Sequence, residues 1–166
     1  MSRLQGPVIL VLLALAGYLG FVLFSETEED RIRERIASFQ DAATFTAETG
    51  NILRMAKAES LPGYFTEDCE IVVAMKGVVR RTLYGRDSVR AAIGQIVRFR
   101  GNLEVKLNDL IVTVAESETE ATVELTATVA YGPPDVLTAQ QFMFEMKKIE
   151  DDWQVHRLRT VDTLRR

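Results

Sequence analysis

The sequence is poor in the side chains that most catalytic and metal sites require. It has one histidine, His156, one cysteine, Cys69, and one tryptophan, Trp153, among 166 residues. A single histidine far from a single cysteine offers no zinc-type spacing, and no acidic stretch alternates as a calcium-binding loop does. A lone cysteine forms no internal disulfide, and no His, Lys or Arg stands beside Cys69 to stabilise a thiolate. We therefore expect no metal, no cofactor and a buried, unreactive Cys69.

Other functional classes also lack their signatures. The chain has no Ser-His-Asp or Cys-His arrangement for nucleophilic catalysis and no glycine-rich phosphate-binding loop. Positive charge is in the minority, since 20 Lys and Arg stand against 24 Asp and Glu, for a net charge of −4. A domain that binds phosphate backbones would normally be basic. We therefore expect no nucleic acid as a partner.

What the sequence has in excess is a long apolar stretch near its beginning. From Leu4 to Phe24 there is no charged residue. As a helix rising 1.5 Å per residue, the stretch would be roughly 30 Å long, enough to cross a bilayer. A cleavable signal peptide is the alternative, because Ala14-Leu15-Ala16 has the small-x-small form that signal peptidase prefers. The apolar residues that continue from Ala16 to Phe24 favour an uncleaved transmembrane anchor over residues 1–24.

The charges that flank this stretch predict its orientation. Arg3 precedes it, and an acidic linker, residues 25–30, follows it with four acids and no base. Positive charge tends to stay on the cytoplasmic side of a membrane. We expect a single-pass protein of the inner membrane, with its N-terminus in the cytoplasm and a domain of residues 31–166 on the periplasmic or other extracytoplasmic side.

Helical periodicity predicts three helices after the linker. Ile32, Ile36, Phe39 and Ala43 recur at steps of four, three and four, which marks one face of a helix. A second helix, about 51–60 with Ile52, Leu53 and Met55, should end at Leu61-Pro62-Gly63. A third should follow Gly85, with Asp87 or Ser88 as its N-cap and Val89 and Ile93 on its apolar face. We expect the apolar positions of the first two helices to pack in the core.

The remaining segments predict strands. Two runs, 69–75 and 78–84, flank Lys76-Gly77 and suggest a hairpin. The alternation over 105–114 is interrupted at Asn108-Asp109, as a bulge would interrupt it, whereas 121–131 keeps a period of two throughout. The runs 139–149 and 153–160, joined by the acidic turn 150–152, supply two more strands.

This order of elements resembles the NTF2-like (SnoaL-like) superfamily. The residues that carry the resemblance are LPGYFTEDCEIVV at 61–73, GRDSVRAAI at 85–93 and DDWQVHRLR at 151–159. The resemblance implies an α+β fold, a cone in which a strongly curved antiparallel sheet wraps around the N-terminal helices and leaves an apolar pocket. Some members are lyases or isomerases, many others bind ligands or dimerise through the sheet, and some membrane-tethered members place the cone outside the inner membrane.

Five polar side chains are candidates for the lining of such a pocket: Tyr64, Asp68, Tyr84, Tyr131 and His156. A neutral imidazole suits proton transfer if a carboxylate orients it, but no acid stands at strand spacing beside His156. Any partner must therefore come from another element. The two faces of the strand that carries His156 both mix polar and apolar residues, so the sequence leaves open which one lines the cone.

Two functions follow from these observations. The first is a membrane-anchored, non-catalytic domain that acts in protein-protein interaction or assembly, as a homodimer or with a protein partner through its sheet. The alternative is a pocket that binds a small, apolar ligand, or a SnoaL-like lyase or isomerase that uses His156 or Asp68.

Overall fold

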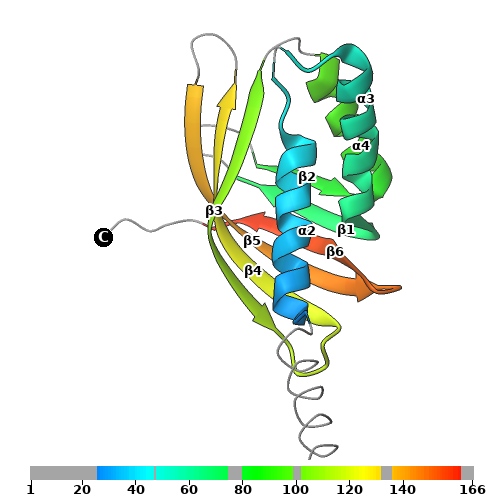
Figure 1. The fold of residues 1–166 in the computed structure, drawn as a ribbon, viewed down its shortest axis with the longest axis vertical. Helices are drawn as coiled ribbons and strands as arrows, with labels where there is room; N and C mark the ends of the chain where they lie inside the picture. Colours follow the sequence, from blue (N-terminus) through cyan, green and yellow to red (C-terminus); the bar gives the residue numbers. More distant parts are fainter. Residues whose placement is uncertain (1–25, 47, 75–79, 99–101, 132–135, 162–166) are drawn as a thin grey trace, which may run out of the picture.

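The computed structural model describes residues 26–46, 48–74, 80–98, 102–131 and 136–161, and Figure 1 shows their arrangement. The helical segments are α2 (Glu28–Ala43), α3 (Asn51–Ser60), the 3₁₀ turn η1 (Leu61–Tyr64) and α4 (Gly85–Arg98). The strands are β1 (Phe65–Val73), β2 (Arg81–Tyr84), β3 (Leu103–Val114), β4 (Glu120–Tyr131), β5 (Val136–Ile149) and β6 (Asp152–Thr160). The predicted anchor, 1–24, lies outside the described residues, and no helix within them is long and apolar enough to span a membrane.

The six strands form one mixed sheet in the order β2-β1-β6-β5-β4-β3. The prediction of an antiparallel sheet is wrong at one pair, since β1 and β6 run parallel. These two strands come from opposite ends of the domain, so no tight turn joins them and forces them into opposite directions. The sheet curves around α2, and α3 and α4 stand beside it (Figure 1). The α+β cone is therefore confirmed, with a mixed rather than an antiparallel sheet.

Helix α2 covers the concave face of the sheet. Thr27 and Asp30 form a capping box at its start, each side chain bonding the backbone of the other residue. The predicted apolar face is confirmed, because Ile32 is 0% and Ile36 is 2% exposed in the main core cluster. The predicted burial of Cys69 in the same cluster is also confirmed.

The end of the same helix provides hydrogen-bond partners for backbone groups at the free edge of β3. The side chain of Gln40 accepts a hydrogen bond from the Leu107 amide at 2.7 Å, and the Thr44 hydroxyl accepts one from the Val105 amide at 3.2 Å. Just beyond the helix, Phe45 and Leu103 exchange two backbone bonds of 2.7 and 2.8 Å. An unpaired strand edge invites association with another chain. Over this part of β3, α2 and the two residues that follow it bond to backbone groups that would otherwise be unpaired.

Two predictions about the helices are wrong. The residues Ile52, Leu53 and Met55 of α3 do not pack in the core, since they are 88%, 54% and 59% exposed. Helix α4 begins at Gly85, so Asp87 and Ser88 lie inside it rather than at its N-cap. Gly85 has a φ of 77°, and a Cβ there would stand 3.3 Å from the Glu67 carbonyl oxygen. Glycine thus allows the chain to pass directly from β2 into the helix.

The strands match their predicted positions closely, with differences at the ends. Strand β1 begins at Phe65, four residues before the predicted run, and the predicted turn at Lys76-Gly77 lies outside the described residues. The predicted bulge in β3 is confirmed by a register shift between Asn108 and Ile111 and by a φ of 56° at Asp109.

A carboxylate joins the start of α2 to the hairpin of β5 and β6. Glu28 accepts hydrogen bonds from Lys148 Nζ at 2.9 Å, from Trp153 Nε1 at 2.8 Å and from Arg31 Nη1 at 3.1 Å. Its side chain is 18% exposed. The bond from Lys148, followed by those from Trp153 and Arg31, keeps the pKa of Glu28 below its ordinary value of 4.5 against the opposing effect of burial.

Glu28→Gln should lower the free energy of unfolding by about 1–3 kcal/mol at neutral pH, because charge-assisted hydrogen bonds are lost. A depressed carboxyl pKa stabilises the fold above the unfolded-state pKa and stops doing so as pH falls through the folded-state pKa. The difference in unfolding free energy between the wild type and Glu28→Gln should therefore become smaller below about pH 4.5, as measured by urea-unfolding curves at several pH values. Glu29→Gln, with an exposed side chain, is the matched control and should change little. If this difference were as large at acid pH as at neutral pH, the stabilising role of the ionised Glu28 carboxylate would be contradicted.

The two-residue turn between β5 and β6 carries backbone strain. Glu150 and Asp151 have φ values of 49° and 71°, and the flanking Ile149 and Asp152 are paired. Such turns favour Asn-Gly or Asp-Gly. We expect Asp151→Gly to raise the free energy of unfolding by roughly 0.5–1 kcal/mol. Glycine removes the strain of the left-handed backbone, and the larger conformational entropy that glycine loses on folding offsets part of this gain. Thermal unfolding should show a higher Tm. Glu116→Gly, in a turn at a residue without positive φ, should instead lower it or leave it unchanged.

Candidate functional site: an apolar cavity and a separate histidine

The cone contains a cavity of about 360 Å³, partly open to solvent, between α4 and the concave side of the sheet. The described residues that line it are all apolar: Phe39, Ala43, Phe45, Leu61, Phe65, Ile71, Leu83, Val89, Ala92, Ile93, Ile96, Leu103, Val105 and Val129. The small side chains of Ala43 and Ala92 stand where larger apolar residues would fill the space. Cavities of this size are within the usual range of small-molecule sites.

Four of the predicted polar candidates, Tyr64, Asp68, Tyr84 and His156, are not among the described residues that line this cavity. Tyr64 packs edge-to-face on Phe39, with ring centroids 5.5 Å apart, and Arg35 lies 4.3 Å above its ring. Tyr84 is 67% exposed at the end of β2. Tyr131 ends β4, and its side chain lies outside what the structure describes. The two remaining candidates, Asp68 and His156, are brought together elsewhere.

His156 lies on the convex side of the sheet, at an irregular point of β6. The register between β5 and β6 shifts there, because Glu145 pairs with Arg157 and Met146 pairs with Val155. Val155 and Leu158 both point into the core, at 2% and 9% exposure, so the residues between them turn outward. This bulge answers the question that the mixed strand pattern left open: His156 does not line the cone.

Asp68, from β1, supplies the acid that the sequence could not place beside His156. Its Oδ1 lies 3.4 Å from His156 Nδ1, and Thr66 Oγ1 lies 3.3 Å from the same nitrogen. A hydrogen bond from Thr66 contributes most to a lowered pKa of the Asp68 carboxyl, and the charges of His156 and Lys147 add to it. With a proton on Nδ1, His156 would point that proton toward the Asp68 carboxylate, while the donor and acceptor roles between Nδ1 and Thr66 Oγ1 depend on the tautomer of the ring. In the neutral ring, Nε2 is then the proton acceptor.

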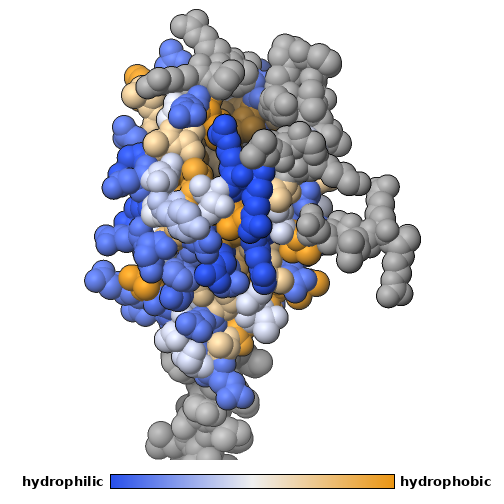
Figure 2. All heavy atoms as spheres, turned by 180° about the vertical axis from the view of Figure 1, so that it is seen from behind, coloured by the Kyte–Doolittle hydropathy of each residue, from blue (hydrophilic) through white to orange (hydrophobic). Residues whose placement is uncertain are grey.

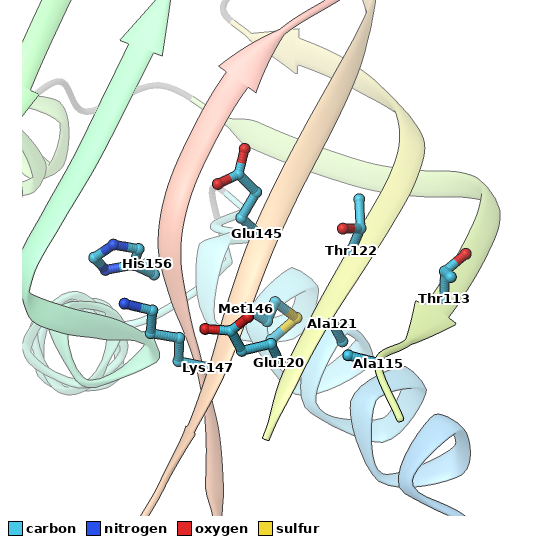
Figure 3. A pocket seen from close by; sticks show the side chains of 9 residues that line it. All are labelled: Thr113, Ala115, Glu120, Ala121, Thr122, Glu145, Met146, Lys147 and His156. Carbon is cyan, nitrogen blue, oxygen red and sulfur yellow. The ribbon is translucent and has the colours of Figure 1, made fainter. Parts of the chain in front are cut away.

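A hollow of about 300 Å³ adjoins this group on the convex side. Figure 3 shows its lining side chains, with α2 behind the strands: Thr113, Ala115, Glu120, Ala121, Thr122, Glu145, Met146, Lys147 and His156. Acids, a lysine and hydroxyls of three strands surround it, whereas the described residues that line the cavity in the cone are apolar. The sheet therefore separates the polar groups from the apolar cavity.

Cys69 and the possible metal ligands form no further reactive site among the described residues. Burial raises the pKa of the Cys69 thiol above its usual value, so the thiol form is favoured. Among the residues that the structure describes, no three His, Cys, Asp or Glu side chains lie close enough together to hold a metal ion.

The sequence predicted the apolar face of α4 but not the cavity that this face lines. Val89 and Ile93 both line the cavity, and Val89 is also 3% exposed in the core. The available signal was Ala92, a small residue beside large apolar ones on the same helix. A sequence pattern cannot distinguish a helix face that fills its space from one that leaves a cavity.

Comparison with solved structures finds proteins of similar fold. A protein from Novosphingobium aromaticivorans, provisionally assigned as a scytalone dehydratase, has a TM-score of 0.64 and 21% identity over 84% of this chain and 89% of its own. A provisional aromatic ring hydroxylase from the same organism has a TM-score of 0.63 and 16% identity over 85% and 94%. An NTF2-like protein with a cystatin-like fold, also from this organism, has a TM-score of 0.59 and 20% identity over 98% and 93%. These likenesses show that the fold is NTF2-like.

No protein-family model matches the chain, and no curated protein matches it.

The Asp68 contact should set the tautomer of His156. Because the chain has one histidine, its two ring nitrogens give unambiguous ¹⁵N signals. At a pH where the ring is neutral, we expect the wild type to carry the proton on Nδ1. Asp68→Asn offers an amide donor to Nδ1 and should move the proton to Nε2. Glu67→Gln, the exposed neighbour, should leave the signals unchanged. A wild-type proton on Nε2 would contradict the contact.

Proposed function

We propose that this domain binds a small apolar molecule in the cavity between α4 and the concave side of the sheet, and holds it without changing it chemically. The observation that carries the proposal is the lining, in which all fourteen residues that the structure describes are apolar. An interior of this kind cannot form a hydrogen bond with a buried polar group, whose transfer from water would be costly. It favours hydrocarbon or aromatic groups, which gain about 25 cal/mol for each Å² removed from water.

The separation of the two sides of the sheet supports binding rather than catalysis in the cone. An acid-base reaction needs a titratable group within hydrogen-bond reach of the reacting atom. The paired His156 and Asp68 face the convex side, while the cavity lies on the concave side. The lyase or isomerase alternative therefore has no acid or base among the lining residues that lie in the described part of the chain.

The convex face of the sheet supports ligand binding in the cavity rather than protein association through the sheet. Arg157 donates to Glu70 at 2.8 Å and to Glu145 at 3.4 Å, and Arg159 lies 3.8 Å from Glu145. Figure 2 shows the molecule from behind, with hydrophilic side chains over most of the described surface and scattered hydrophobic ones. This face offers paired charges rather than a continuous apolar area, which is why we place the function in the cavity.

The location of the domain is a proposal that rests on the sequence. Residues 4–24 are uncharged, and α2 begins at Glu28. We propose that the apolar segment anchors the domain to the inner membrane, with the domain on the outer side. An apolar ligand would then be bound close to a bilayer, where such molecules collect.

Ala92→Phe should close the cavity, because Ala92 lines it and a phenyl ring would occupy the space of a ligand. Ala91→Phe, at the exposed neighbouring position of the same helix, is the matched control. In the fragment 26–166, we expect the affinity for the neutral fluorophore N-phenyl-1-naphthylamine to fall at least about tenfold in Ala92→Phe, a change of about 1.4 kcal/mol, and to stay unchanged in Ala91→Phe.

Circular dichroism of both variants should match that of the wild type, so that a loss of binding reports on the cavity and not on the fold. Equal affinity in the wild type and Ala92→Phe would contradict the proposed function, as would a wild-type fragment that binds no fluorophore.

A further inference from the structure

Arg81 is a cationic residue without an acid partner at the first position of β2. It is exposed, and it makes no hydrogen bond or ion pair with any residue in the described part of the chain. Two arginines of α4 differ, since Arg86 donates to the Phe65 carbonyl at 2.9 and 2.7 Å and Arg90 pairs with Asp87 at 2.6 Å. The guanidinium of Arg81 is therefore free to bind an anion from outside the chain.

The register of β1 and β2 places Arg81 on the cavity side of the sheet. Ile71 pairs with Leu83, and both line the cavity. Two positions further along, Val73 pairs with Arg81, and Val73 packs against the main core cluster. Side chains two positions apart on a strand share a face, and their Cα atoms are about 6.8 Å apart. Arg81 therefore follows the lining residue Leu83 on the same face, within the reach of an arginine side chain.

Arg81 lies at the rim of the cavity and not in its wall. Strand β1 ends at Val73 and β2 begins at Arg81, so this pair is the last that the two strands form. Exposure rises toward it, from buried Ile71 through half-buried Leu83 and Val73 to exposed Arg81. Neither residue of the last pair lines the cavity, whereas both residues of the pair before it do. A molecule in the cavity would meet Arg81 where it meets water.

The neighbouring acids of β1 do not compete for this guanidinium. Asp68 and Glu70 face the convex side, where they lie 3.4 Å from His156 and 2.8 Å from Arg157. An apolar cavity with one unpaired cation at its rim fits a molecule that is apolar along its length and carries a single negative charge at one end. A buried charge would be costly, but this charge stays at the surface.

The volume of the cavity and the charge of its rim define the ligand further. If a methylene group occupies as much space as a water molecule in the liquid, about 30 Å³, a cavity of about 360 Å³ holds a chain of about twelve carbons. A guanidinium binds a carboxylate through two parallel hydrogen bonds and balances its one charge. A phosphate monoester carries a charge of about −1.5 to −2, which one arginine does not balance.

We propose that the cavity binds a fatty acid of medium chain length, with the alkyl chain among the apolar side chains and the carboxylate on Arg81. This inference rests on the proposed function, which places an apolar molecule in the same cavity, and adds the chemical class of that molecule. Arg81 is then the residue that distinguishes an acid from a neutral molecule with the same chain.

Dodecanoate and 1-dodecanol test this assignment, because they share a chain and differ in the charge of the head group. Their affinities are measured by displacement of N-phenyl-1-naphthylamine from the fragment 26–166, which contains every described element around the cavity. We expect Arg81→Gln to weaken dodecanoate binding at least about fivefold, since charge-assisted hydrogen bonds at an exposed site are lost. The affinities for 1-dodecanol and for the fluorophore should stay unchanged, which also shows that the variant is folded.

Arg80→Gln is the matched control. It removes the same charge from an exposed residue one position earlier, out of phase with Leu83, and should leave dodecanoate binding unchanged. Equal losses in Arg80→Gln and Arg81→Gln would overturn the proposal, because they indicate a general attraction to a basic surface. An equal loss of dodecanoate and 1-dodecanol in Arg81→Gln would overturn it as well, as would no loss of either.

Dodecyl phosphate tests the head group. Binding to the wild type more than about tenfold tighter than that of dodecanoate would replace the carboxylate by a phosphate and overturn the assignment to a fatty acid. Failure of this inference is distinguishable from failure of the proposed function. If Ala92→Phe weakens fluorophore binding while Arg81→Gln leaves dodecanoate unaffected, the cavity binds apolar molecules and only the assignment to fatty acids is wrong. A wild-type fragment that binds no fluorophore contradicts both.

Discussion

The packing of α2 on the concave side of the sheet is the contact on which the rest of the domain depends. Glu28, Arg31 and Arg35 follow one another at steps of three and four along the helix and bond to the hairpin of β5 and β6. Gln40 and Thr44, further along, bond to the other end of the sheet at β3. One helix therefore spans the curvature of the sheet from β6 to β3. The cavity is the space that α2 does not fill, between its last turns and α4.

The curvature of the sheet also determines which polar side chains can contact one another. At the bulge in β6, the chain turns His156 outward, and the neighbouring stretch of β1 brings Asp68 to it. The apolar residues on either side of the bulge keep their place in the core. Two kinds of environment thus lie within one sheet's thickness of each other without mixing, and a ligand in the cone meets none of the charged groups that adjoin His156.

The sequence predicted those elements whose signals are local. The spacing of Ile32 and Ile36 located α2, Pro62 correctly placed the end of α3, and Asn108-Asp109 marked the bulge in β3. Features that depend on distant segments were missed. No local pattern relates β1 to β6, and none reports that Asp68 approaches His156. The exposed side of α3 was misassigned because periodicity identifies an apolar face but not the direction in which tertiary packing turns it.

The parallel pairing of β1 with β6 has a consequence for how the chain acquires its structure. Strand β6 lies between β1 and β5, so the sheet consists of two unconnected parts until β6 takes its place. During synthesis, β1 and β2 are completed long before their central neighbour exists, and the edges that they present are unpaired in the meantime. Contacts between residues so far apart in sequence also slow folding. The emerging chain is therefore most exposed to aggregation in the interval before the last strand is made.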